Sequence, residues 1–243
     1  MVMDGYVDLV TFDGRTSDDP DFGIELVTVI QRPLLTDTKD KTISVTGMDG
    51  VWDLGADRGP ANILVIFYFQ GGTMEQLRAY TRNLAAWLSP KTVKPLIFAD
   101  EPDKQYFARR TSEIPVEQVL TLGHVEVNFF CPDPHAHAIT TKTASPNAGT
   151  APTPVKITAT MTANTDHLQV DLGDQHIRLE TALTTGDEIL IDTNQGWVAL
   201  NGLDARDKLT YDSELRQFLL PVGEFTLSAD NATLSYVYRE RWL

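Results

Sequence analysis

The second part of the chain consists of short stretches in which apolar and polar residues alternate. Between residues 155 and 238 they read VKITATM, LQVDLGDQHIRLE, EILIDTNQGWVALNG and FTLSADNATLSYVY. Because successive side chains of a strand point to opposite faces, this period of two predicts strands with one buried face. Breaks at Gly-Asp, Asn-Gln-Gly and Asp-Asn predict tight turns. The pattern indicates an antiparallel β-sandwich and requires no helix of any length.

A compositional break separates this part from the first. Residues 140–156, TTKTASPNAGTAPTPVK, are rich in Thr, Ala, Pro, Ser and Gly and show no hydrophobic period. Such a segment is typical of a linker, and its prolines favour an extended path. The sequence therefore predicts a first domain over 1–140, a linker over 141–154 and a second domain over 155–243.

The first part combines one helix with strands. TMEQLRAYTRNLAAWLSP predicts the helix, because Thr73 and Gln76 have capping-box spacing and apolar residues recur every three or four positions. β-Branched and aromatic residues predict five strands, at 25–30, 63–69, 95–99, 105–110 and 124–130. We expect a mainly β chain with an α+β first domain.

Residues 31–60 differ from the rest of the first part. KTISVTG, at 41–47, is polar on both sides of its alternation, and the flanking RPLLTDTKDK and GMDGVWDLGADRGP are polar and rich in turn residues. A core strand would present at least one apolar face. The segment therefore predicts an exposed hairpin that stands off the body as an arm.

The composition excludes several classes of function. The chain has 243 residues, one cysteine and a net charge of −14 shared by both parts, which argues against a surface built to neutralise phosphates. One cysteine allows no intrachain disulfide. The longest apolar run, ILVIFYF at 63–69, is far short of the ~20 residues of a membrane helix. The first residues lack the basic start and long apolar run of a secretory signal, so none is expected.

LIFADEPDKQYFARR, at 96–110, contains acids close to bases, as an active site does. Both flanks are strand-like, however, and Asp100, Glu101, Pro102 and Asp103 suit the turn of a hairpin, since proline fixes φ and Asp accepts local backbone bonds. No motif elsewhere supplies catalytic partners. The sequence favours a hairpin turn over an acid–base or metal site.

Other chemical patterns are weak. Cys131, His135 and His137, with His124 upstream, do not have a zinc spacing, and Cys131 is expected to be a small buried hydrophobe. No nucleotide-binding loop or nucleophile motif is present. Trp197, Tyr236 and Tyr238 suit either sugar stacking or a sandwich core, and the core is favoured.

The chain nevertheless resembles a known family, the distal tail proteins (Dit) of siphophages. The resemblance covers nearly the whole chain. Its most specific piece is the DEPDK segment with the aromatic and arginine residues that follow. The other stretches that carry it are DFGIELVTVIQRPLL, GMDGVWDLG, LRAYTRNLAAWLSP, TSEIPVEQVLTLGHVEVNFFCPDPHA, GTAPTPVKITATM, TTGDEILIDTNQGWVALNG and the terminal YRERWL.

The resemblance implies a virion tail-tip protein without enzymatic activity or cofactor, assembled in the host cytoplasm. The first domain would form a hexameric ring whose arm embraces the neighbouring subunit, and the second would be a galectin-like sandwich. Partners would be the tail tube protein, a tail-associated lysin or fibre protein and receptor-binding proteins. There would be no membrane partner and no specific nucleic-acid binding, although DNA would pass through the lumen. Residues expected at the arm interface are Lys39, Lys41, Ile43, Val45, Met48, Asp49 and Trp52.

Two other hypotheses remain at this point. A carbohydrate-binding module would require exposed, coplanar aromatic side chains on the second domain. A metal-dependent hydrolase would require His124, His135 and His137 to cluster with nearby acids.

Overall fold

The computed structural model describes residues 9–111, 113 and 116–243, and the chain divides into two compact units. The first unit ends at Ala136 and includes Leu243, and the second comprises His137–Trp242. The division lies before the segment 141–154 that the sequence predicts as a linker. Residues 1–8, where no secretory signal is expected, lie outside the described residues.

The first unit is built on a long antiparallel sheet with the strand order β2-β1-β7-β8-β10-β6-β3, and β9 also pairs with β10. The five strands predicted from composition correspond to β3, β6, β7, β8 and β10. The strands are β1 (Val10–Phe12), β2 (Arg15–Thr16), β3 (Ile24–Gln31), β6 (Ala61–Gln70), β7 (Lys94–Phe98), β8 (Lys104–Thr111), β9 (Val116–Val119) and β10 (Leu122–Cys131).

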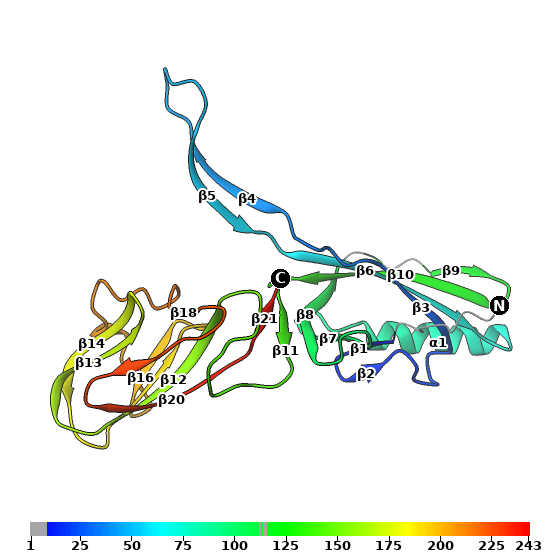
Figure 1. The fold of residues 1–243 in the computed structure, drawn as a ribbon. Coiled ribbons are helices and arrows are strands. Elements are labelled where there is room, and N and C mark those ends of the chain that lie inside the picture. Colours follow the sequence, from blue (N-terminus) through cyan, green and yellow to red (C-terminus); the bar gives the residue numbers. More distant parts are fainter. Residues whose placement is uncertain (1–8, 112, 114–115) are drawn as a thin grey trace. The chain divides into compact units, whose positions relative to one another are not determined.

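One helix, α1 (Met74–Trp87), lies along a face of this sheet, as Figure 1 shows. The backbone N–H of Gln76 donates to the Thr73 hydroxyl at 3.2 Å, and the Gln76 side-chain oxygen accepts from the Gly72 N–H at 2.9 Å. These bonds satisfy donors that a helix start leaves free, so the capping prediction is confirmed. The predicted stripe also holds, since Leu77, Leu84 and Trp87 are buried.

The core of the first unit lies between α1 and the sheet. Trp87 stacks on Phe22 with ring centroids 4.7 Å apart, and its indole N–H donates to the carbonyl of Phe12 at 2.9 Å. This bond satisfies the polar atom of a buried aromatic residue. β10 buries every second residue from Gly123 to Cys131, the period expected of a strand with one core face.

A separate two-stranded sheet is formed by β4 (Thr38–Ile43) and β5 (Trp52–Arg58). Figure 1 shows this hairpin extending beyond the strand ends of the sheet in its own unit. Every residue of both strands is exposed. The exposed hairpin arm predicted within residues 31–60 is therefore present in the fold.

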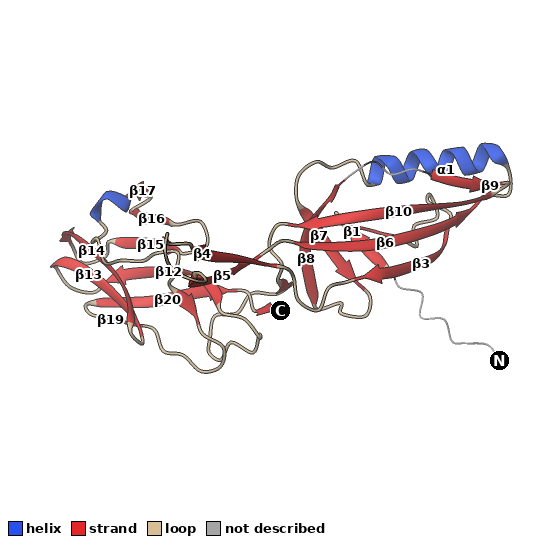
Figure 2. Ribbon diagram, turned by 90° about the horizontal axis from the view of Figure 1, so that it is seen from above, coloured by secondary structure: helices blue, strands red, loops and turns tan. Residues whose placement is uncertain are grey.

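The second unit is a sandwich of two antiparallel sheets, shown from above in Figure 2. One sheet has the order β17-β16-β15-β12-β18, and β20 also pairs with β12. The second sheet has the order β14-β13-β19. Ile157 of β12 and Leu179 of β14 are both fully buried in one core, so the two sheets face each other. The mainly β prediction is confirmed, while the galectin-like relationship stays a prediction.

The bounds of the remaining elements follow the turn signals of the sequence closely. They are β11 (Ala136–Ala138), β12 (Thr153–Met161), β13 (Thr165–Leu172), β14 (Gln175–Leu183), β15 (Glu188–Asp192), β16 (Trp197–Leu200), β17 (Leu203–Asp204), the 3-10 helix η1 (Arg206–Lys208), β18 (Leu219–Leu220), β19 (Ser228–Ala229), β20 (Ala232–Tyr238) and β21 (Arg241–Trp242).

Residues 141–154 are held by the C-terminal strands of the second unit. The buried carboxylate of Glu240 accepts from the Lys142 ammonium at 2.6 Å and from the Ala148 N–H at 2.7 Å. The Tyr238 hydroxyl lies 2.8 Å from the carbonyl oxygen of Ala144, and burial raises the pKa of Tyr238 to about 12. Asn147 is fully buried. The segment contains bends at 144–145 and 149–150 and is bonded to the sandwich. The linker and the boundary near 140 stay predictions.

Candidate assembly interface

The arm places the predicted interface residues along one hairpin. Lys39, Lys41 and Ile43 lie on β4 and Trp52 lies on β5, while Val45, Met48 and Asp49 lie in the connection between the strands. Ile43 pairs directly with Trp52. Side chains of directly paired residues project from the same face. Lys39, Lys41, Ile43 and Trp52 therefore share one face of the arm.

The distal part of the arm, residues 43–54, is here called the arm tip. It exposes five large apolar side chains, and Trp52 alone is 58% exposed. The five are Ile43, Val45, Val51, Trp52 and Leu54. The tip contains no lysine, arginine or histidine, and its charged residues are Asp49 and Asp53. An apolar, acidic surface of this kind is unusual on an isolated hairpin and is typical of a contact site.

The middle of the arm has a different character. Lys41 forms an ion pair with Asp57 across the strands, with the ammonium nitrogen 2.7 Å from the carboxylate oxygen. Lys39 lies directly opposite Asp57 in the register. Exposed pairs of this kind contribute about 0–1 kcal/mol. The middle of the hairpin is therefore charged, while its apolar side chains gather at the tip.

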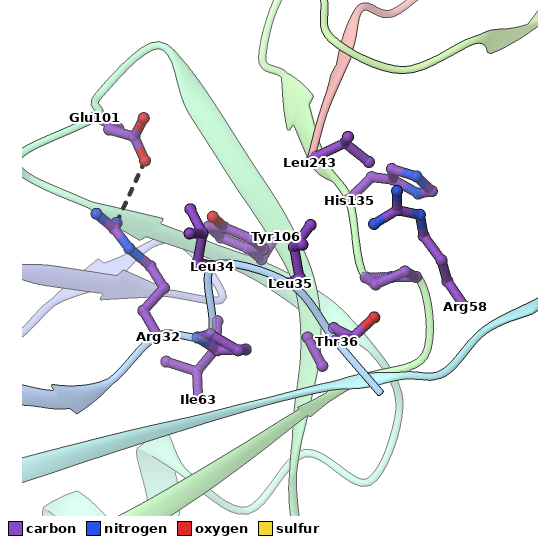
Figure 3. A pocket seen from close by; sticks show the side chains of 13 residues that line it. Arg32, Leu34, Leu35, Thr36, Arg58, Ile63, Glu101, Tyr106, His135 and Leu243 are labelled. Carbon is purple, nitrogen blue, oxygen red and sulfur yellow. Dashed lines mark ion pairs between the residues drawn. The ribbon is translucent and has the colours of Figure 1, made fainter. Parts of the chain in front are cut away.

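A cavity of about 330 Å³ lies where the arm joins the body, and it is here called the root cavity. Leu34, which is 87% exposed, and Leu35 lie beside Tyr106 in its middle (Figure 3). Figure 3 draws Arg32 with Glu101 at one end of the cavity and Arg58, His135 and Leu243 at the other. The lining of the cavity is thus mixed, with apolar side chains in the middle and charged groups at both ends.

The turn residues Asp100, Glu101, Pro102 and Asp103 lie between the antiparallel strands β7 and β8. Asp100 and Glu101 bind Arg32 at the root of the arm. The Arg32 guanidinium lies 2.6 Å from a carboxylate oxygen of Asp100 and 3.3 Å from one of Glu101. Lys104 lies 2.7 Å from the other oxygen of Glu101. Two of the turn carboxylates are thus engaged in ion pairs that anchor the arm, which suits a structural role.

The pKa values of Arg32 and Lys104 follow from these ion pairs. Burial alone lowers the pKa of Arg32, but the hydrogen bond to Asp100 and the charges of Asp100 and Glu101 outweigh it, so the pKa lies above its ordinary value. The hydrogen bond to Glu101 raises the pKa of Lys104. Burial raises the pKa of the Tyr106 phenol. All three groups keep their ordinary protonation state near neutral pH, so none is prepared for proton transfer.

The histidines and the cysteine considered for a metal site are not brought together. His124 stacks on Tyr68 and faces Glu117 at 3.6 Å, while His135 pairs with Asp133 at 2.6 Å. Cys131 is fully buried, and burial raises its pKa to about 12. Among the described residues, no three potential metal ligands cluster. The hydrolase hypothesis therefore has no site in the part of the chain that the structure covers.

The aromatic residues considered for sugar stacking pack against other side chains of the second unit. Tyr238 is buried, and Tyr236 is half-buried against Phe225 with ring centroids 5.7 Å apart. The Arg206 guanidinium lies 4.5 Å from the ring centre of Trp197 and covers it. The core interpretation of Tyr236 and Tyr238 agrees with this packing.

Sequence reasoning missed most residues of the cavity, among them Arg32, Leu34 and Leu35. Arg32 and Asp100 are 68 positions apart, and no local pattern links them. Leu34 and Leu35 form the single apolar pair of the otherwise polar stretch RPLLTDTKDK, at 32–41. That isolated pair was the available signal. In a segment without periodicity, exposed leucines indicate a contact rather than a core.

Comparisons with known proteins agree with this geometry. Residues 17–131 match the model of the phage tail protein RIFT-related domain, and residues 148–242 match that of the C-terminal domain of siphovirus-type tail components. The distal tail protein of Bacillus phage SPP1 is 25% identical over 214 residues, which are 82% of this chain and 83% of that protein. The chain belongs to the siphovirus distal tail protein family.

The fold of the family is shared as well. The crystal structure of SPP1 Dit superposes with a TM-score of 0.76 at 21% identity, covering 98% of this chain and all of that chain. The protein is thus a structural component of a phage tail and not an enzyme. No helix in the described part of the chain is long and apolar enough to cross a membrane.

Proposed function

We propose that this chain assembles into a closed hexameric ring at the virion tail tip and acts as the hub that joins the tail tube to the host-adsorption proteins. The observation that carries the proposal is the arm. A two-stranded hairpin alone is marginal in water, and this one places five large apolar side chains in solvent. A partner surface that covers the arm stabilises it.

The similar SPP1 protein is described as a paradigm of the hub adsorption apparatus in phages that infect Gram-positive bacteria. By analogy, the neighbours of the ring are the tail tube protein on one side and a tail-associated lysin or fibre protein on the other. Receptor-binding proteins dock on the second unit. Assembly takes place in the host cytoplasm, and DNA passes through the lumen without specific binding, which suits a net charge of −14.

The test is the solution mass of the full chain by multiangle light scattering at micromolar concentration, together with negative-stain microscopy. A particle of six copies with a central opening supports the hub. A monomer that binds saccharide on a glycan array supports the carbohydrate-binding module instead. Co-expression with the tail tube protein of the same phage then tests the partner, and copurification of a ring–tube complex is the expected result.

A further inference from the structure

The smaller sheet of the sandwich, β14-β13-β19, has an outer face whose cross-strand pairs are all polar. Leu168 and Val170 of β13 are fully buried in the core, so the residues that alternate with them point away from it. Three directly opposed pairs occupy this outer face, and each of the six side chains ends in a planar polar group. The pairs are His167–Glu180, Gln169–Arg178 and Asp171–His176. They are here called the polar face.

Side chains of the polar face hold one another in place. The Gln169 amide nitrogen donates to the Asp171 carboxylate at 2.8 Å, and the Gln169 amide oxygen accepts from the Arg178 guanidinium at 3.3 Å. Both strands are paired over this length, so the backbone beneath is fixed as well. Groups that are already ordered lose less entropy when a ligand binds. The polar face is thus an ordered array of hydrogen-bond donors and acceptors that is open to solvent.

One donor in this array has no hydrogen bond. The Arg178 Nε atom is buried and makes no hydrogen bond within the part of the chain that the structure describes. The Glu180 carboxylate oxygen lies 3.5 Å away, which is an ion pair but is longer than an ordinary N–H···O hydrogen bond. Buried donors are nearly always bonded, so this one indicates a missing acceptor. The Glu180 side chain is 63% exposed, so it can move aside for a ligand oxygen without disturbing the core.

A loop with an exposed aromatic ring borders the polar face. The Ser213 hydroxyl accepts from the backbone N–H of Arg178 at 2.8 Å, and the Asp212 carboxylate lies 2.9 Å from the His176 imidazole nitrogen. These two contacts fix the loop along β14. Tyr211, directly before them, is fully exposed. The ring therefore stands in solvent on a segment that is anchored to two residues of the polar face.

The charges at this surface decide the class of ligand. Asp171, Glu180 and Asp212 supply three carboxylates against the single guanidinium of Arg178. A surface with this balance repels phosphate and other anions. Its carboxylates and amide fit neighbouring hydroxyl groups, because each hydroxyl both donates and accepts. The apolar C–H face of a sugar ring matches the face of a tyrosine ring, which is apolar with a polar tip.

We propose that the polar face binds a neutral saccharide, with hydroxyl groups of one pyranose ring on Gln169, Asp171 and Arg178 and the C–H face of a sugar ring against Tyr211. The site uses none of the aromatic residues that the sequence suggested for sugar stacking. It goes beyond the hub function and depends on the second unit alone. If the chain forms a ring, each copy adds one such site, and simultaneous binding of several copies raises the avidity for a polysaccharide.

A glycan array probed with the full chain tests the ligand class. The array carries neutral oligosaccharides of glucose, galactose, N-acetylglucosamine and rhamnose, together with poly(glycerol phosphate). The expected result is retention on at least one neutral saccharide and none on the phosphate polymer, and calorimetric titration then gives the affinity for the retained saccharide. Absence of binding to every neutral saccharide, or retention on poly(glycerol phosphate) alone, overturns the inference.

Two variants assign the binding to the polar face. Tyr211→Ala should weaken the affinity about tenfold, and Arg178→Lys should weaken it to a similar extent because an ammonium group lacks the planar fork of a guanidinium. The thermal unfolding midpoint of Tyr211→Ala should not change, since the side chain is fully exposed. Thr160→Ala and Thr233→Ala, at exposed positions of the other sheet, are the matched controls and should bind like the unmodified chain.

Unchanged affinity in both Tyr211→Ala and Arg178→Lys, or an equal loss in the threonine controls, contradicts the assignment. Light scattering of the array sample separates this inference from the hub. A ring that binds no neutral saccharide overturns the inference and leaves the hub intact. A monomer whose saccharide binding depends on Tyr211 supports the inference and overturns the hub. A monomer that binds no saccharide overturns both.

Discussion

Two hairpins of this protein have the same local structure and opposite surroundings. The arm, β4–β5, and the sandwich hairpin, β13–β14, are both antiparallel pairs with one register irregularity. The sandwich hairpin buries Leu168, Val170, Ile177 and Leu179 completely, whereas the arm buries no residue. The alternation of apolar residues decides the difference. One hairpin is stabilised by the core of its own unit, and the other leaves its side chains in solvent.

The comparison predicts its largest effect in the sandwich. Leu179→Ala should lower the free energy of unfolding by about 2–5 kcal/mol, because it removes buried methyl groups and leaves a cavity. The matched change in the arm, Trp52→Ala, should alter it by no more than about 0.5 kcal/mol, since that side chain is solvated in the single chain. Chemical denaturation at concentrations below assembly measures both. Similar losses for the two variants would show that the arm packs on its own chain.

A second prediction concerns residues 137–147, a polar segment that, unlike the arm, is bonded to its own unit. A fragment starting at Ala148 should fold as a monomeric sandwich. A fragment starting at His137 should be more stable by about 1–3 kcal/mol, since it keeps the partners of Glu240 and Tyr238. Circular dichroism and urea unfolding check this. An unfolded 148–243 fragment would place the start of the second domain earlier in the chain. Equal stabilities of the two fragments would show that residues 137–147 do not stabilise the sandwich.

A smaller effect is expected at the turn beside the arm root. Asp100→Ala, Glu101→Ala and Asp103→Ala should each cost about 1 kcal/mol or less, and Asp103→Ala the least, because Asp100 and Glu101 bind Arg32. Pro102→Gly should loosen the turn slightly by adding freedom to the unfolded chain. Thermal unfolding of these variants measures the order of their losses of stability. A hydrolytic activity that vanishes with any of these variants would overturn the structural interpretation of the turn.

The smallest effect on folding, and the largest on assembly, belongs to the arm itself. Deletion of residues 36–50 should leave the unfolding free energy of the first unit nearly unchanged, because the core loses none of its buried residues. The same deletion should prevent a stable ring. Light scattering and denaturation of one sample separate the two results. An intact ring after the deletion would show that the arm binds the tube or the proteins below the ring instead.

Much of the fold could be predicted from local patterns. Thr73, Gln76 and the stripe that includes Leu77 and Leu84 predicted α1, because capping and a 3.6-residue period are local properties. The strands of the sandwich followed from alternation and turn residues. β1 and β2 were missed because a three-residue and a two-residue strand are too short to show a period. They exist because Val10 and Thr11 pair with β7, which is far away in the sequence.

The sequence by itself determined that residues 31–60 cannot form a core, since the segment offers no apolar face, and that the acids of DEPDK lie on a turn. Only the tertiary structure decided what lies around that turn. The pairing of Arg32 with Asp100 and the cavity with Leu34 and Leu35 depend on segments from separate parts of the chain, namely 32–36, 58–63, 101–106, 134–135 and 243. Tertiary packing determines burial and ion pairing between residues that are far apart in the sequence, so local sequence patterns do not predict them.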